Sequence, residues 1–187
     1  MQDKPDFKQI ILETDRLILK ELNPEIIYNL FTFFNDEEIK NYMGLRSENE
    51  LELERMRFEQ GNATFNISFK TFLLIDKATG TVVGRTGFHN WYAHHFRAEI
   101  GYTITDENFL QKGYMTEANK AVVEYGFEHM DLNRIEAFIA AYNTPSLKIL
   151  LRLGFKKEGT LRQHYFVNNK IEDSDCYGLL KKEYYAR

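Results

Sequence analysis

The 187-residue sequence has few of the features that mark secreted, membrane-spanning or nucleic-acid-binding proteins. Its single cysteine, Cys176, excludes an internal disulfide and a cysteine-clustered zinc site. No apolar run approaches the roughly 20 residues of a membrane-spanning helix, and the first residues do not open a signal peptide. The formal net charge of −4 leaves no basic excess to neutralise nucleic-acid phosphates. We therefore expect a cytoplasmic monomer or small homo-oligomer, with neither nucleic acid nor membrane as a partner.

Length and hydrophobic patterning predict one domain, residues 1–187, built on a mixed α/β sheet. Alternating apolar and polar residues predict an early strand at residues 14–20. Asn23-Pro24-Glu25 is typical of a helix start, because it combines a cap, an N-terminal proline and a first-turn acid. The capping-box pattern at residues 47–50 predicts a second, strongly charged helix.

The rest of the chain alternates between strand and helix patterns. We expect strands at residues 72–75, 81–84, 85–89, 98–104 and 134–140, a helix after Gly113, a helix that Thr144 caps and Gly154 ends, and a final hairpin of residues 155–166 and 171–184 around Asn168-Asn169. In strand 98–104 the apolar residues fall on one face, so Glu99 points from the other.

Two segments about thirty residues apart, 109–118 and 143–155, predict a ligand site. Each passes from a strand-like run through a short turn into an amphipathic helix. The turn before Gly113 could present backbone N–H groups at a helix N-terminus, where anions bind readily. The second segment places Asn143 and Ser146 at the head of a neighbouring helix. Two such heads side by side suggest a phosphate-bearing cofactor with an extended arm.

This pattern resembles the GNAT superfamily of acetyl-CoA-dependent N-acetyltransferases, and within it the branch of ribosomal-protein N-terminal (alanine) acetyltransferases. The resemblance is carried, in the family's order, by residues 13–19, 98–102, 112–118 and 143–146 leading to 153–155. It spans nearly the whole chain. It implies an α/β (α+β) fold with a central, mostly antiparallel twisted sheet, a splayed pair of parallel strands and flanking helices.

The pyrophosphate loop departs from the family's usual Q/R-x-x-G-x-G/A pattern, which falls here on residues 110–115. Gly113 matches the pattern. Leu110 stands where Gln or Arg is usual, Gln111 where the related branch prefers glycine, and Met115 where a small residue is usual. Because backbone amides do most of the phosphate binding, these changes need not abolish it, although they bear on affinity and loop geometry.

The resemblance also implies which residues hold the cosubstrate, acetyl-CoA, and it implies no metal. The cofactor-binding residues would be Tyr102, Thr103 and Ile104 along a strand edge for pantetheine, the amides of Gln111, Lys112, Gly113, Tyr114, Met115 and Thr116 for the pyrophosphate, and Asn143 with Ser146 at the second helix head.

Glu99 is the predicted catalytic base, acting directly or through water, and we expect partial burial to raise its pKa. Ser146 is predicted to protonate or orient the leaving sulfur. The simpler readings are a salt-bridged strand glutamate and a serine that satisfies helix amides. His89, His164 and Tyr165 are further candidates for bases or walls of the acceptor pocket. Tyr142 and Tyr165 carry phenols that could serve as acids.

We therefore predict direct, ternary-complex transfer of an acetyl group to a primary amine, either a protein N-terminus or a small molecule. The acceptor stays open because fold likeness does not identify it. The main alternative is a non-catalytic acyl-CoA sensor or interaction module on the same fold. A third is a protein that binds a different phosphate-bearing nucleotide at the Gly113 loop.

Overall fold

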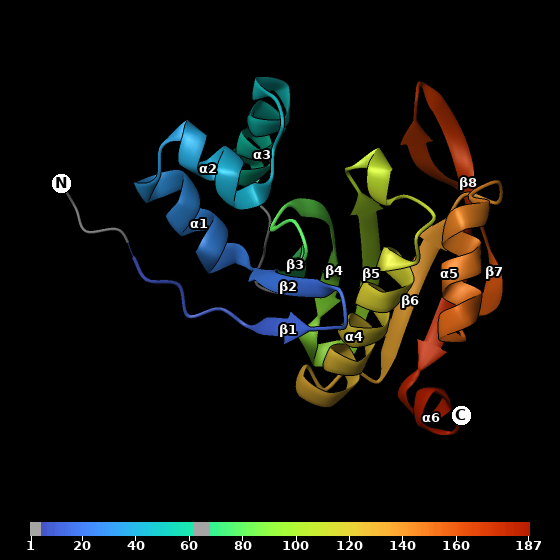
Figure 1. Cartoon of the computed structure of the whole chain (residues 1–187). Helices are drawn as coiled ribbons and strands as arrows, with labels where there is room; N and C mark the ends of the chain where they lie inside the picture. The colour runs from blue at the N-terminus through green and yellow to red at the C-terminus, as the bar shows by residue number, and fades with distance from the viewer. Residues whose placement is uncertain (1–4, 62–67) are drawn as a thin grey trace.

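The computed structural model describes residues 5–61 and 68–187, and within these it has one eight-stranded sheet and six α-helices (Figure 1). The strands are β1 (Ile11–Glu13), β2 (Leu17–Leu22), β3 (Ser68–Asp76), β4 (Val82–Tyr92), β5 (Arg97–Ile104), β6 (Arg134–Ile139), β7 (Lys156–Val167) and β8 (Lys170–Leu180). The helices are α1 (Pro24–Phe33), α2 (Asp36–Met43), α3 (Glu48–Gln60), α4 (Tyr114–His129), α5 (Thr144–Leu153) and α6 (Lys181–Tyr185). None of these helices is long and apolar enough to cross a membrane.

The sheet order is β1-β2-β3-β4-β5-β6-β8-β7, and only β5 and β6 pair in parallel. Their pairing joins residues 97–99 to residues 134–136, although β5 continues to Ile104 and β6 to Ile139. The two strands therefore part after Glu99 and Glu136. The mixed α/β fold and the splayed parallel pair are both confirmed.

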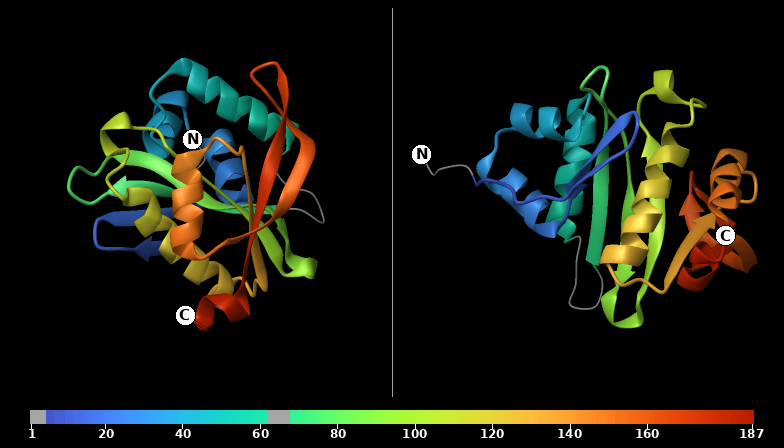
Figure 2. Two further views of the ribbon diagram at one scale, coloured as in Figure 1. Left: turned by 90° about the vertical axis from the view of Figure 1, so that its right-hand side faces the viewer. Right: turned by 60° about the horizontal axis from the view of Figure 1, so that its bottom comes forward.

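The sheet is covered on both faces (Figure 2). One core lies between the sheet and α4 with α5, and includes Phe72, Phe88, Ile100, Val122 and Leu150. The other lies under α1, α2 and α3, and includes Ile26, Leu30, Ile39, Leu51 and Leu73. Because Phe72 and Leu73 are neighbours in β3 yet belong to opposite cores, this strand is buried on both sides, and burying each side chain contributes about 1.5–3 kcal/mol.

Several expected helix and turn signals are confirmed. Asn23 caps α1 by accepting a hydrogen bond from the Ile26 N–H. Gly113 precedes α4 directly. The final hairpin turns at Asn168 and Asn169, whose φ angles of 49° and 60° suit a tight two-residue turn.

Other expectations were wrong at the level of single elements. Helix α2 was missed, although Asn35 and Glu38 form a reciprocal capping box there. Ser47 does cap α3, but Glu50 accepts from the Arg46 N–H, so the reciprocal half of the box is missing. The strands expected at residues 81–84 and 85–89 are a single strand, β4, which begins at Val82, and β1 was not expected.

The ends of two later elements also differ from expectation. Asn143, not Thr144, caps α5, because its Oδ1 accepts from the Ser146 N–H while Thr144 is already helical. The last segment, Lys181–Tyr185, is the short helix α6 and not the end of a strand.

Candidate active site

Glu99 lies where the parallel strands begin to part. Its neighbours Ala98 and Ile100 are buried in the core under α4, so Glu99 projects from the opposite face, and it is 6 % exposed. Three side chains donate to its carboxylate. His89 Nε2 lies 3.0 Å from Oε1, Asn90 Nδ2 lies 2.9 Å from Oε2, and the Tyr165 hydroxyl lies 3.4 Å from Oε1. Glu99 is therefore a buried carboxylate with its acceptor positions largely filled.

The expected rise in the pKa of Glu99 is wrong in direction. Burial does act to raise the pKa of this carboxyl, but the hydrogen bonds from His89, Asn90 and Tyr165 outweigh burial, and the pKa lies below its ordinary value. The group is thus a carboxylate at neutral pH. A carboxylate stabilised in this way is a weak proton acceptor by itself, but it can orient and polarise the groups that donate to it.

A second carboxylate lies directly beside Glu99, because Glu136 is its register partner on β6. Arg97 and Arg134 both pair with Glu136, and Arg134 also makes a two-pronged pair with Glu158, at 2.7 and 2.6 Å. This cluster holds the closed end of the splayed pair together. Glu136 is committed to the scaffold, whereas Glu99 is bound by groups that can exchange protons or hydrogen bonds with a substrate.

His89 is the partner of Glu99 that faces outward. It lies opposite Glu99 in the β4–β5 ladder, and its side chain is 43 % exposed. Its ring covers Gly101, since a Cβ placed on Gly101 would lie 2.5 Å from Cε1 and 2.8 Å from Nδ1 of His89. With Nε2 donating to Glu99, Nδ1 is the ring nitrogen outside that bond, and it lies over Gly101 of β5.

The loop before α4 has two residues with positive φ. Gly113 is the N-cap residue, with φ of 83°, and Gln111 also has a positive φ, 58°. That conformation favours glycine, so Gln111 is held in a backbone conformation that a side chain disfavours. The amides that follow open the first turn of α4, where an anion is stabilised by unpaired N–H groups and the helix dipole.

Thr14 and Arg16, in the early segment that carried part of the resemblance, hold the loop before α4 in place through hydrogen bonds. Thr14 Oγ1 donates to Glu117 Oε1 at 2.6 Å, and Arg16 donates to the same carboxylate through its backbone N, at 2.9 Å, and through Nε, at 2.7 Å. Arg16 also donates to the Lys112 carbonyl at 2.9 Å. Burial acts to raise the pKa of Glu117, but the bonds from Thr14 and Arg16 outweigh it and lower the pKa. The sequence had suggested no role for these residues.

The N-terminus of α5 contacts β5 at Tyr102. Its hydroxyl donates to the Ser146 carbonyl at 3.4 Å, while Asn143 accepts from the Ser146 N–H at 3.2 Å. Burial raises the pKa of Tyr102 to about 12, so its phenol stays protonated. The structure therefore brings Tyr102, Asn143 and Ser146 together on the same face of the sheet as α4.

The remaining predicted residues divide between the site and its surroundings. Tyr165 reaches Glu99, and its pKa is raised to about 12 by burial and by the adjacent carboxylate. His164 packs its ring on Tyr165, at 4.4 Å between centroids, without a contact to Glu99 among the described interactions. Tyr142 is exposed and donates to Glu172 at 2.6 Å, so it is not brought to Glu99. Across residues 5–61 and 68–187 no cluster of metal-ligating side chains is present.

A cavity of about 230 Å³ lies on the same face as Glu99, between α1, α3 and the strands β3 and β4. His89 and Asn90 line one end of it. Three charged side chains, Glu54, Arg57 and Arg85, line another part. Sequence reasoning missed this grouping, because Glu54 and Arg57 come from a helix whose position over the sheet cannot be read from its own pattern. Only the alternation of Arg85, Gly87 and His89 along β4 indicated that Arg85 and His89 share a face.

Comparison with known proteins gives this arrangement a family. The family model described as "Acetyltransferase (GNAT) domain" matches residues 16–156. The chain belongs to the GNAT acetyltransferase family. The uncharacterized N-acetyltransferase YoaA of Bacillus subtilis is 34 % identical over 172 residues, covering 91 % of this chain and 97 % of that protein. The "Putative ribosomal N-acetyltransferase YdaF" of the same organism is 37 % identical over 105 residues, 56 % of this chain and 57 % of that one.

The fold of this GNAT protein matches solved structures as well. A GNAT-family acetyltransferase from Bacillus anthracis superposes with a TM-score of 0.65 at 23 % identity, covering 93 % of this chain and all (100 %) of that one. The chain is thus an acyltransferase that transfers an acetyl group to an amine, and the resemblance drawn from its motifs is confirmed. The non-catalytic sensor is not favoured. Acetyltransferases of this family use acetyl-CoA.

Proposed function

We propose that this GNAT protein binds acetyl-CoA in the opening between β5 and β6 and transfers the acetyl group directly to a primary amine held beside His89 and Glu99. One observation carries the proposal. The β5–β6 ladder stops at Glu99 and Glu136, so the opening ends where a buried carboxylate polarises a half-exposed imidazole. A thioester at the inner end of the opening and an amine on the His89 face would meet there.

The chain has a suitable set of groups for the cosubstrate. The edge of β5 at Tyr102, Thr103 and Ile104, beyond the end of the ladder, can hydrogen-bond to pantetheine. The amides of Gln111, Lys112, Gly113, Tyr114, Met115 and Thr116 can bind the pyrophosphate at the start of α4. Asn143 and Ser146 lie at the head of α5, where they can contact the arm of the molecule. Acetyl-CoA supplies the acetyl group as a thioester.

The amine must lose a proton before it can attack, because an ammonium has no lone pair. We assign that proton to Nδ1 of His89, with Glu99 accepting the Nε2–H bond, fixing the tautomer and stabilising the imidazolium. This refines the earlier choice of Glu99 as base, since Glu99 is nearly buried and has a lowered pKa. Glu99 then acts through His89.

In the net step the amine nitrogen forms a bond to the acetyl carbon and the bond from that carbon to sulfur breaks. The first proton of the ammonium passes to His89, and the second, lost from nitrogen as the amide forms, neutralises the departing thiolate, so that coenzyme A leaves as the thiol. Ser146 is the candidate for orienting that sulfur, because it lies in the first turn of α5. Tyr102 places a protonated phenol beside Ser146 and can hold the helix head in position.

The test is thiol release from acetyl-CoA across a panel of amines and N-terminal peptides, with direct acetyl-CoA binding measured alongside. Amine-dependent release supports the proposal and identifies the acceptor class. Both α-amines and side-chain amines belong in the panel, since an α-amine with pKa near 8 needs less help than a lysine near 10.4. Tight binding of acetyl-CoA without release for any amine would contradict it.

A further inference from the structure

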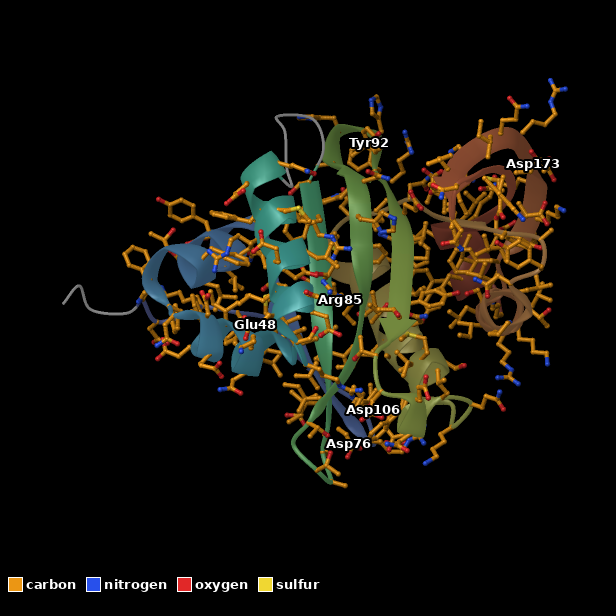
Figure 3. All side chains as sticks on the ribbon, turned by 90° about the horizontal axis from the view of Figure 1, so that it is seen from above. Glu48, Asp76, Arg85, Tyr92, Asp106 and Asp173 are labelled. Atoms are coloured by element: carbon orange, nitrogen blue, oxygen red, sulfur yellow. The ribbon has the colours of Figure 1, made fainter. Side chains whose placement is uncertain are left out.

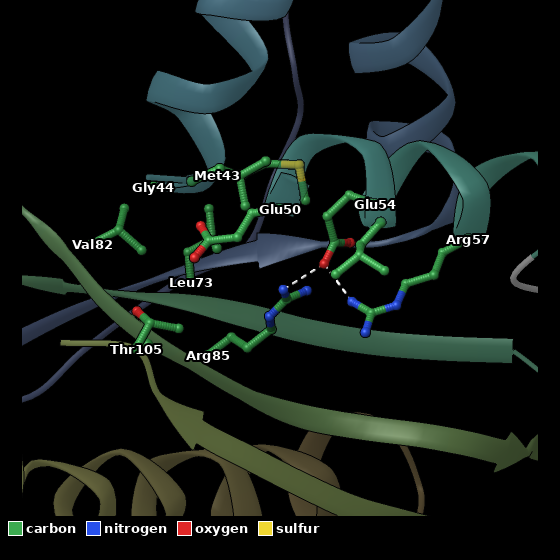
Figure 4. A pocket seen from close by; sticks show the side chains of 12 residues that line it. Met43, Gly44, Glu50, Glu54, Arg57, Leu73, Val82, Arg85 and Thr105 are labelled. Carbon is green, nitrogen blue, oxygen red and sulfur yellow. Dashed lines mark hydrogen bonds and ion pairs between the residues drawn. The ribbon is translucent and has the colours of Figure 1, made fainter. Parts of the chain in front are cut away.

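The cavity on the Glu99 face is lined by two arginine side chains and one glutamate side chain. Arg57 on α3 and Arg85 on β4 both pair with the same oxygen, Oε1 of Glu54, as Figure 4 shows. The Glu54 side chain is 10 % exposed, whereas those of Arg57 and Arg85 are 56 % and 32 % exposed. Two guanidinium groups thus share one buried carboxylate oxygen, and the group carries a net charge of +1 on the cavity wall.

Each of these arginines has donors beyond its bond to Glu54. A guanidinium carries five N–H donors in a planar fork, and this geometry suits the two oxygens of a carboxylate. Arg57 and Arg85 come from different elements, α3 and β4, and both line this cavity as well as the neighbouring pocket drawn in Figure 4. They can therefore bind an anionic group from two sides while Glu54 keeps them in place.

The position of the pair relative to the reacting amine follows from the strand. Arg85 and His89 point from the same face of β4, since Arg85 pairs with Thr103 and His89 with Glu99 across the β4–β5 ladder. Strands rise about 3.3 Å per residue, so the two Cα atoms lie about 13 Å apart. Figure 3 shows Arg85 part-way along the sheet, with Asp76 and Asp106 toward one end and Tyr92 toward the other. The cavity reaches from Arg85 to His89 and Asn90.

We infer, building on the function proposed above, that the acceptor amine belongs to a molecule that carries a carboxylate on the order of 10 Å from its nitrogen, the scale set by the Arg85–His89 spacing, bound by Arg57 and Arg85. In an extended peptide that distance fits an acidic side chain at the third residue, since successive residues advance about 3.4 Å. A straight-chain amino acid whose amine and carboxylate are separated by a similar distance would present the same two groups. Polyamines fit poorly, because a second ammonium would lie against the two guanidiniums.

The decisive comparison uses acceptors that differ only in charge at that distance. Amidated hexapeptides with a free α-amine and Glu, Gln or Lys at the third position would be assayed for thiol release from acetyl-CoA. We expect kcat/KM for the Glu peptide to exceed that for the Gln peptide about tenfold, with the Lys peptide and spermidine lower still. Comparing 8-aminooctanoate with its amide distinguishes a small amino acid from a peptide as the source of the carboxylate.

Variants of the arginines separate binding from scaffolding. In Arg85→Gln and in Arg57→Gln the Glu-to-Gln peptide preference should fall toward one, while the Kd for acetyl-CoA stays within about twofold. Arg55→Gln is the matched control, because Arg55 lies on the same helix but pairs with Asp36 outside the cavity. That variant should keep the full preference.

Each result has a defined meaning. No release with any amine would overturn the proposed function itself. Release with equal kcat/KM for Glu, Gln and Lys peptides, or the highest value for spermidine, would overturn only the carboxylate inference. If Arg85→Gln slowed the reaction of all acceptors equally, the arginines would have a structural role and would not bind the carboxylate of the acceptor. If it weakened acetyl-CoA binding instead, they would serve the cosubstrate.

Discussion

The imidazole of His89 is held between the Glu99 carboxylate and the Gly101 backbone. Nε2 lies 3.0 Å from Oε1 of Glu99, and the ring covers the position where any other residue at 101 would place its Cβ. Both contacts depend on the same β4–β5 register, in which His89 opposes Glu99 and Gly87 opposes Gly101. The register thus fixes the direction in which Nδ1 points.

If His89 and Glu99 act as one unit, their substitutions should not be additive. We expect His89→Gln and Glu99→Gln each to lower kcat about 100-fold, and the double variant to be little worse than either, because each loss disables the same proton acceptor. The Kd for acetyl-CoA should change less than about twofold. Glu172→Gln, at a half-buried carboxylate paired with Tyr142, is the control and should retain its rate. Unchanged kcat in Glu99→Gln at saturating acetyl-CoA would remove Glu99 from the mechanism.

Gly101→Ala tests the placement of the His89 ring without altering either polar group. The new Cβ would lie 2.5 Å from Cε1 of His89, so the ring must swing away, which a side-chain terminus can do at little cost to the fold. We expect kcat to fall at least about tenfold while Tm stays within a few degrees. Gly159→Ala is the matched control, since its Cβ would meet nothing within 4 Å. Equal rates for the two variants would contradict a positioned imidazole.

The Arg16–Glu117 network predicts how stability depends on pH. The pKa of Glu117 is lowered in the folded protein, so its contribution is fully present above the unfolded value and is lost as pH falls through the folded pKa. Glu117→Gln should lower the free energy of unfolding by about 1–2 kcal/mol at pH 7, discounted because the Arg16 side chain is 42 % exposed. Denaturant titrations should show the gap shrinking below about pH 4. A gap that stays constant down to pH 3 would contradict this account.

The sequence predicted most of what depends on neighbours along the chain. The cap at Asn23, the helix after Gly113 and the turn at Asn168 and Asn169 were all read from local patterns. The capping box at Asn35 was equally local, and it was overlooked because the following helix is short and polar.

What could not be predicted depends on strand register and helix placement. Glu99 was assigned to the right face, but the lowering of its pKa depends on His89, Asn90 and Tyr165, which come from two other strands. The Glu54–Arg57–Arg85 group needs α3 to lie over β4, and nothing in the pattern of either element states that. The family motif predicts residues on the cofactor side, whereas the acceptor side was left open for this reason.

The departure from the family pattern at Gln111 leads to the last prediction. Its φ of 58° is a conformation that costs a side chain about 1–2 kcal/mol, whereas glycine adopts it freely but loses more backbone entropy on folding. Gln111→Gly should therefore stabilise the protein by about 0.5 kcal/mol, and should leave the Kd for acetyl-CoA unchanged or lower, because backbone amides bind the phosphates. Asn169→Gly is the control, since asparagine tolerates its φ of 60° and gains less. Calorimetric binding and thermal unfolding measure both effects. A loss of acetyl-CoA affinity in Gln111→Gly would show that the glutamine side chain itself contacts the cosubstrate.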